Sequence, residues 1–338
     1  MIRFNNDYNV IAHPRVLDAL RAHAQESYPG YGEDAWCEKA AELIRTKAAC
    51  PEASVFFVPG ATQANYIVVA AALSPVESVI CADTGHIFCH EAASIENTGH
   101  KLLTVPHHDG KITAADVAAE AAKYYDGGTP EYLTEPRLVY LSLSTEVGTV
   151  YTKAELAAIR KACSTYGMRL FVDGARLGYG LGADGCDITL SDLAALTDVF
   201  YIGGTKCGAM FGEALVITDK TLQRRFKAYM KQNGAVLAKG WLMGLQFCAL
   251  LTDDLYFDIT RRADEQAMQL RDAFRAKGIQ EAVVSPTNQQ FVILADAQKA
   301  KLADRFTFED EGDSVRFCTS WATKDEDLAA LIEAIERL

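Results

Sequence analysis

The sequence predicts an α/β protein with a large domain built on a mostly parallel central sheet, followed by a small C-terminal α+β domain. Short apolar runs, typical of buried parallel strands, alternate with helical stretches over about the first 250 residues. From about Leu251 the pattern becomes helix, strand, strand, helix, strand and helix. The length of 338 residues is typical of about two domains. We expect the large domain at residues 1–250 and the small domain at 251–338, and leave open whether residues 1–13 pack on the small domain.

Each element follows from a local pattern. Strands of the large domain are predicted where apolar residues form short runs, at 54–58, 78–82, 101–106, 138–143, 169–172, 199–202 and 213–218. Helices are predicted where apolar residues recur at helical spacing, at 14–23, 36–49, 113–125, 153–166 and 222–230. In the small domain we expect helices at 254–277 and 325–338, with strands at 281–285, 290–294 and 315–318. The span between Gly178 and Asp198 is expected to be irregular.

Composition excludes several classes of protein. The formal charge is −12, with 45 acidic against 33 basic side chains, which argues against a nucleic-acid partner. No apolar run approaches the roughly 20 residues of a membrane span, so no membrane association is expected. The nine cysteines form no C-x-x-C pair and predict a reduced, cytoplasmic protein. The very apolar stretch 240–251 either packs against a second subunit or begins a long inter-domain helix.

Two predicted strands end in residues that suit one cofactor. Asp173 follows the run 169–172, and Lys206 follows a glycine-rich turn after 199–202. Pyridoxal 5′-phosphate needs an amine that forms an imine with its aldehyde and a carboxylate that keeps its ring nitrogen protonated. The alternative is that Asp173 caps a helix and Lys206 is a solvated loop lysine. The glycines around both residues favour the cofactor site.

The motifs F-V-D-G-A-R and G-G-T-K resemble the threonine aldolase family of fold-type-I pyridoxal enzymes, within the wider β-eliminating lyase group. The resemblance extends over nearly the whole chain and implies a PLP-dependent transferase-like fold. It also implies a homo-oligomer, a dimer or a dimer of dimers such as a homotetramer, with shared active sites.

A phosphate site is predicted where the strand 54–58 leads into P-G-A-T-Q-A-N. Small residues before a helix expose backbone N–H groups that can bind a phosphate. The threonine aldolase family has a similar element there, which makes Gly60, Ala61 and Thr62 candidate ligands. Thr205, adjacent to the candidate lysine, is a further phosphate candidate.

His86 and His90 are four residues apart and Glu91 follows, which raises the question of a metal site. No third ligand is evident, so no metal is predicted. The segment resembles the family's H-I-x-x-x-E stretch, which implies that His86 stacks on the cofactor ring and assists proton transfer. Glu146 stands where many relatives have a histidine, and it can carry a proton near neutral pH only if burial raises its pKa. The base is therefore His86, with Glu146 as the rival.

The resemblance also implies residues that hold the substrate and the cofactor. Arg176 would lie near the cofactor hydroxyl and the substrate carboxylate, for which a planar guanidinium is suited. Arg316 lies on an otherwise apolar strand and needs an anionic partner, which the resemblance identifies as the substrate α-carboxylate. Asn6 and Tyr31 are matched to substrate-binding positions, although a turn residue and a packed tyrosine would explain them equally well. Lys231 is matched to a basic residue that reaches a phosphate across a dimer interface.

The sequence therefore predicts a lyase that cleaves a β-hydroxy-α-amino acid, threonine or allo-threonine, to glycine and an aldehyde. Two alternatives stay open. One is a β-eliminating lyase that acts on serine- or cysteine-like substrates. The other is a non-catalytic, cofactor-binding regulatory homologue. A nicotinamide-dependent dehydrogenase is disfavoured, because no G-x-G-x-x-G follows the first strands.

Overall fold

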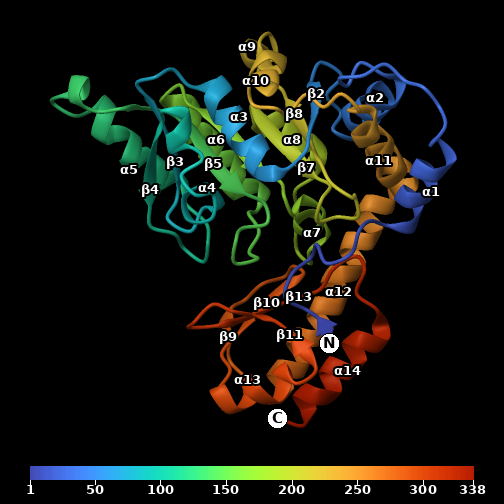
Figure 1. Ribbon diagram of the computed structural model, residues 1–338. Helices are drawn as coiled ribbons and strands as arrows, with labels where there is room; N and C mark the ends of the chain where they lie inside the picture. Colours follow the sequence, from blue (N-terminus) through green and yellow to red (C-terminus); the bar gives the residue numbers. More distant parts are fainter.

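The computed structural model describes residues 1–338 and contains a central sheet of seven strands in the order β2-β8-β7-β6-β5-β3-β4 (Figure 1). Only β8 is antiparallel to its neighbours; all other pairings are parallel. The strands are β2 (Ser54–Val58), β3 (Glu77–Ala82), β4 (Lys101–Val105), β5 (Glu135–Ser142), β6 (Arg169–Asp173), β7 (Val199–Gly203) and β8 (Glu213–Ile217). All seven predicted strands are present, with ends that differ by three residues at most.

Both faces of this sheet are buried, as expected for a mostly parallel sheet. Successive side chains of a strand point to opposite faces, so Val172 and Phe200 belong to one apolar cluster whereas Phe171 and Tyr201 belong to the other. The helices that accompany the sheet are α1 (Pro14–Ala22), α2 (Ala35–Lys47), α3 (Ala61–Ala72), α4 (His86–Cys89), α5 (Ala114–Tyr125), α6 (Lys153–Thr165), α7 (Leu177–Gly182), α8 (Leu190–Leu196), α9 (Lys220–Gln223), α10 (Phe226–Gln232) and α11 (Trp241–Leu251). Short 3₁₀ turns occur at Glu96–Thr98, Pro130–Tyr132 and Thr252–Asp254.

Two local predictions were wrong. The span between Gly178 and Asp198 is not irregular, because it contains most of α7 and all of α8. The helix α8 is stabilised at its start by a reciprocal cap, in which Thr189 accepts from the backbone N–H of Asp192 and the Asp192 carboxylate accepts from Thr189. The single helix expected at 222–230 is instead divided into α9 and α10.

The C-terminal part of the chain forms its own antiparallel sheet, in the order β12-β13-β10-β9. Its elements are α12 (Leu255–Ala276), β9 (Glu281–Val283), β10 (Gln289–Val292), α13 (Asp296–Ala303), β11 (Phe306–Thr307), β12 (Glu309–Asp310), β13 (Val315–Cys318) and α14 (Asp325–Glu336). The strand β1 (Ile2–Arg3) pairs with β11, so the N-terminus lies beside this C-terminal part (Figure 1). A separate buried cluster around Leu270, Phe274 and Phe317 forms its core.

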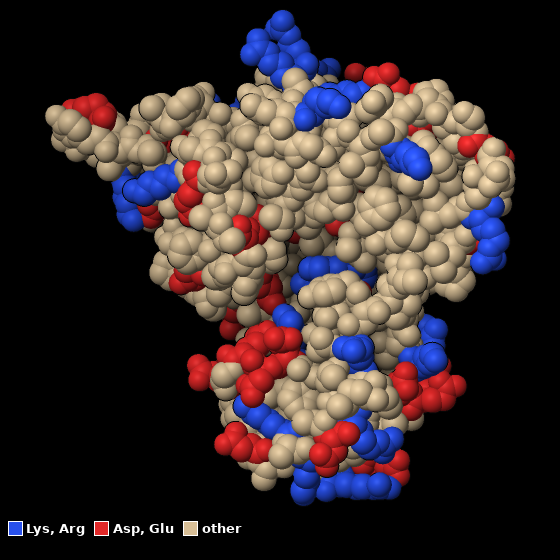
Figure 2. Space-filling view, viewed as in Figure 1, with Lys and Arg blue, Asp and Glu red and all other residues tan.

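The arrangement brings several strand ends and the C-terminal sheet to a common cleft. Ser142 and Asp173 end β5 and β6, and Lys206 follows β7, so the carboxyl ends of three parallel strands meet there. Figure 2 shows a hollow between the part with the seven-stranded sheet and the C-terminal part, with basic and acidic side chains on its walls. No helix of the protein is both long enough and apolar enough to cross a membrane.

Candidate active site

The cleft consists of two adjoining cavities that share His86, Glu146, Arg176 and Lys206. The inner cavity also contains Asp173, and the outer one, of about 640 Å³, also contains Arg316. Ala61 also lines the inner cavity, so seven of the predicted site residues face one space, although they are spread over 256 positions of the chain between Ala61 and Arg316, counting both ends (316 − 61 + 1). A separate cavity of about 150 Å³ beside Tyr31 contains neither Asp173 nor Lys206.

Asp173 is a buried carboxylate with three hydrogen-bond donors. Its Oδ1 accepts from the backbone N–H of Ala175 at 2.9 Å, and its Oδ2 accepts from Asn65 Nδ2 at 2.9 Å and the Tyr140 hydroxyl at 2.6 Å. Burial raises the pKa of Tyr140 well above its usual value, so that hydroxyl remains a donor. The three donors fix the orientation of this carboxylate, which is the kind of group that a pyridinium nitrogen requires as its partner.

Lys206 follows the turn after β7 and extends into the same cavity as Asp173. Burial lowers the pKa of its ammonium, because a charged group loses its hydration. The nearby Arg176 guanidinium lowers this pKa further, because it repels a second positive charge. The neutral amine, which is the nucleophile needed for imine formation, is thereby favoured.

The turn that carries Lys206 is held by Glu213, a buried carboxyl at the start of β8. Glu213 accepts from the backbone N–H of Gly204 at 2.8 Å and from the Thr205 hydroxyl at 2.7 Å. Burial raises the pKa of Glu213 to about 7. The Thr205 hydroxyl donates to Glu213 and accepts from Gly212 at 3.0 Å, so its bonds within the chain fix the turn.

His86 lies on α4 with its ring held by a carboxylate. Its Nδ1 lies 2.9 Å from Glu91 Oε1, which also accepts from Asn65 Nδ2 at 2.7 Å. The other oxygen of Glu91 accepts from the Ser94 hydroxyl at 2.7 Å. A carboxylate at Nδ1 favours the tautomer with its proton on that nitrogen, which leaves Nε2 as the basic nitrogen.

Glu146 lies in the loop after β5 and faces the cleft. Its carboxylate accepts from the backbone N–H of His86 at 2.8 Å and from the Ser142 hydroxyl at 2.6 Å. Burial raises the pKa of Glu146, and the two donors oppose that rise. The direction of the shift is the one that a proton carrier near neutral pH needs.

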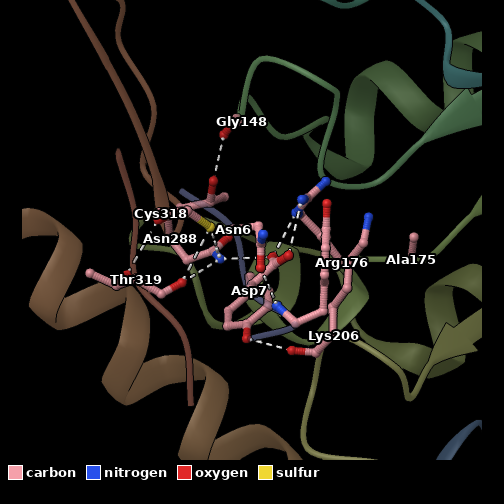
Figure 3. Close-up of polar contacts among 12 residues, drawn as sticks. Asn6, Asp7, Gly148, Ala175, Arg176, Lys206, Asn288, Cys318 and Thr319 are labelled. Atoms are coloured by element: carbon pink, nitrogen blue, oxygen red, sulfur yellow. Dashed lines mark hydrogen bonds and ion pairs between the residues drawn. The ribbon is translucent and has the colours of Figure 1, made fainter. Parts of the chain in front are cut away.

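The two candidate arginines have different carboxylate partners. Arg176 makes a two-point contact with Asp7, with Nε at 2.7 Å and Nη2 at 3.1 Å from the two carboxylate oxygens. Asp7 also accepts from Asn288 Nδ2 at 3.1 Å, and Figure 3 shows it between Arg176 and Asn288. Arg316 forms its ion pair with Glu311, at 3.3 Å, and its Nε is buried without a hydrogen-bond partner in the chain.

The candidate phosphate loop lies at the start of α3. Gly60 precedes the helix in an extended conformation, and no side chain caps the helix. Ala61 faces the inner cavity, whereas the side chain of Thr62 is exposed. The first N–H groups of α3 are therefore free to bind an anion.

Asn6, Tyr31 and Lys231 line neither cavity of the cleft within one chain. The side chain of Asn6 accepts from the backbone N–H of Tyr8 at 3.1 Å. Tyr31 is 52% exposed, and the Lys231 ammonium lies 5.0 Å from the centre of its ring. Their assignment to a substrate or phosphate site remains a prediction.

Sequence reasoning missed five residues that hold the site together, namely Asp7, Asn65, Tyr140, Ser142 and Glu213. Two of them stand inside or beside motifs already identified: Asn65 ends the A-T-Q-A-N element, and Asp7 follows Asn6. The other three occur in apolar strands, where a polar residue with a functional partner cannot be distinguished by pattern from one that is merely buried.

Comparison with known proteins identifies the family of the chain. The family model for the beta-eliminating lyases matches residues 13–297. The chain is 31% identical over 327 residues to the low specificity L-threonine aldolase of Pseudomonas aeruginosa, which covers 95% of this chain and 92% of that protein. It is 26% identical to the low specificity L-threonine aldolase of Saccharomyces cerevisiae, over 78% of this chain and 66% of that protein.

Solved structures extend the comparison to the fold. A threonine aldolase of Leishmania major superposes with a TM-score of 0.96 at 41% identity, over 100% of this chain and 99% of that one. A mutant aspartate aminotransferase of Thermus thermophilus superposes with a TM-score of 0.76 at 15% identity, over 100% and 91%, which is a likeness of fold alone. These comparisons confirm the predicted fold-type-I class, and the chain belongs to the beta-eliminating lyase family.

Proposed function

We propose that this lyase is a pyridoxal 5′-phosphate-dependent aldolase that cleaves a β-hydroxy-α-amino acid, threonine or allo-threonine, to glycine and an aldehyde. The observation that carries the proposal is the position of Asp173 and Lys206 in one cavity, at the ends of adjacent parallel strands. The printed names of the threonine aldolases from Pseudomonas aeruginosa and Leishmania major support the reaction type.

The residues present fit the cofactor. Asp173 would bind the ring nitrogen, and Lys206 would form the imine with the aldehyde. Gly60, Ala61 and Thr62 would receive the phosphate at the uncapped start of α3. When bound, pyridoxal phosphate accepts the electrons released as the bond between Cα and Cβ breaks.

The chain's own side chains would bind and orient the substrate. Arg316 would take the α-carboxylate, because its guanidinium faces the outer cavity and its buried Nε has no partner. Arg176 is the second cation of the cleft. A base must also take the proton of the β-hydroxyl. His86 could accept it at Nε2, and Glu146 could accept it at its carboxylate, which burial makes more basic.

A second enzyme function is favoured by the family itself. The beta-eliminating lyase family is named after β-elimination. This reaction would convert serine- or cysteine-like substrates to pyruvate and ammonia. Analysis of the products distinguishes the two enzymes, because an aldolase yields glycine and an aldehyde instead. A non-catalytic regulatory homologue would carry the chromophore of the bound cofactor and convert no substrate.

We also propose an organisation that fits this function. The large domain comprises residues 1–250 and the small domain 251–338, because the two sheets have separate cores. The active form is a cytoplasmic dimer or dimer of dimers with shared sites, which would give the exposed Tyr31 and Lys231 a cleft to contact on a partner subunit.

The test combines a spectrum with product analysis. Purified protein supplied with pyridoxal phosphate is expected to show visible absorbance and to release glycine from a panel of threonine stereoisomers and phenylserine. Lys206→Ala is expected to lose the absorbance and the activity, whereas Lys101→Ala, at an exposed position on β4, keeps both. A colourless wild type that takes up no added cofactor would refute the proposal. Pyruvate and ammonia as products would favour the β-eliminating alternative.

A further inference from the structure

Asp7 is a buried carboxylate that joins three separate parts of the chain. It lies in the N-terminal segment between β1 and α1, and its side chain has 0% exposure. It contacts Arg176, which follows β6, at 2.7 and 3.1 Å. It also accepts from Asn288, which precedes β10 in the C-terminal part, at 3.1 Å (Figure 3).

The two arginines of the cleft differ in how firmly they are held. The side chains of Arg176 and Asp7 are 14% and 0% exposed, and their contact has two points. Those of Arg316 and Glu311 are 20% and 36% exposed, with one contact at 3.3 Å. Breaking a buried two-point pair is less favourable than breaking a single contact that is more exposed to water. Arg316 can therefore exchange its carboxylate partner, whereas Arg176 cannot.

Asp7 also acts on the charge around Lys206. Although burial opposes ionisation, the Arg176 and Lys206 cations hold the pKa of Asp7 below its usual value, so Asp7 is ionised. Arg176 lowers the pKa of Lys206, and Asp7 raises it. The carboxylate thus offsets part of the effect of the guanidinium on the reactive amine.

We propose that Asp7 is a positioning residue that holds Arg176 as a stationary charge beside Lys206. The substrate carboxylate therefore binds Arg316 and displaces Glu311 from it. This inference rests on the proposed function. Glu311 is the resting partner that the substrate displaces, and Asp7 is a partner that stays in place through the reaction.

The first experiment is a pH titration of the visible absorbance of the holoenzyme, which reports the loss of the proton on the Lys206 nitrogen. Asp7→Asn is expected to lower the midpoint by about one pH unit, because a nearby negative charge is lost. Asp7→Glu retains the charge and stays close to the wild-type midpoint. Asp264→Asn, at a buried carboxyl of α12 outside the cleft, leaves the midpoint unchanged and controls for a general loss of stability.

The second experiment tests the exchange on Arg316 and does not depend on the folding of the Asp7→Asn variant. Glu311→Gln is expected to lower KM for threonine severalfold with little change in kcat, because the competing carboxylate is removed. Glu309→Gln, at a neighbouring acidic residue of the same cavity, controls for the general charge of the rim.

The outcomes separate the inference from the function on which it rests. A midpoint in Asp7→Asn equal to that of the wild type would overturn the role of Asp7, even if the melting temperature falls. An unchanged KM in Glu311→Gln, or an equal fall in Glu309→Gln, would overturn the exchange. Absence of visible absorbance in the wild type would instead refute the proposed function.

Discussion

At the scale of single residues, Glu146 is the candidate base whose chemistry depends most on burial. A buried carboxyl and an imidazole can perform the same proton transfer if burial brings the carboxyl pKa toward neutrality. The raised pKa of Glu146 and its place on the cleft meet that condition. His86, whose Nδ1 is held by Glu91, is the competing base.

The first prediction concerns the dependence of kcat on pH. If Glu146 is the base, it must be deprotonated to act, so kcat rises with pH through its raised pKa. Glu146→Gln is expected to lower kcat about 100-fold and to abolish this rise. Ser142→Ala removes a hydrogen bond that lowers the pKa of Glu146, so the rise moves to higher pH.

The comparison that decides between the two bases is His86→Gln. If kcat of that variant is reduced but still rises with pH as in the wild type, this rise, the acidic limb of the pH–rate profile, supports Glu146 as the group that titrates. Persistence of the limb in Glu146→Gln and its loss in His86→Gln would assign it to the imidazole. Full pH–rate profiles of the three variants measure the difference.

At the scale of elements, the loop that carries Glu146 is held by the C-terminal sheet region. The Ser285 and Thr287 hydroxyls both donate to the backbone carbonyl of Gly148 at 3.1 Å. Gly148 has a φ of +79°, and a Cβ there would lie 2.3 Å from Ser285 Oγ, so glycine is required for both reasons. The C-terminal part therefore positions a candidate base as well as Arg316.

The second prediction concerns this clamp, by which we mean the two hydrogen bonds from Ser285 and Thr287 to the Gly148 carbonyl. The double variant Ser285→Ala, Thr287→Ala leaves the Gly148 carbonyl without its buried donors, which should lower the free energy of unfolding by about 2 kcal/mol. We also expect kcat to fall severalfold, because Glu146 is held less firmly. The control is Thr260→Ala, whose buried hydroxyl bonds only within α12. An equal fall of kcat in the control would contradict a specific role for the clamp.

The sequence predicted the elements of the sheet better than the network around them. Apolar runs such as 199–202 identify buried strands locally, and motifs placed Asp173 and Lys206 at strand ends. By contrast, the pairing of Asp7 with Arg176 joins residues far apart in the chain, and no periodicity encodes it. The helix α8 was missed because its seven residues are too few for a helical period to stand out.

At the scale of the whole molecule, the single chain contains most but not all of the predicted site. Asp173, Lys206 and Arg316 face one cleft, whereas Lys231 and Tyr31 contact each other outside it. A symmetric dimer places the same surface of each copy against the other, so a residue outside one cleft can complete the cleft of its partner. Lys231 would then supply a positive charge to the phosphate bound by the partner subunit.

The last prediction tests this sharing by mixing two variants. Lys206→Ala removes the amine of a site, and Lys231→Ala is expected to weaken cofactor binding in the neighbouring site. Each variant alone is expected to be nearly inactive at limiting cofactor. After the two are unfolded, mixed and refolded together, a hybrid dimer contains one site with both lysines intact. About a quarter of wild-type activity should return, because half of the dimers are hybrids and each holds one intact site. If Lys231 served its own chain, the intact residues would never meet in one site and mixing would restore nothing; refolded wild type and separately refolded variants give the reference rates.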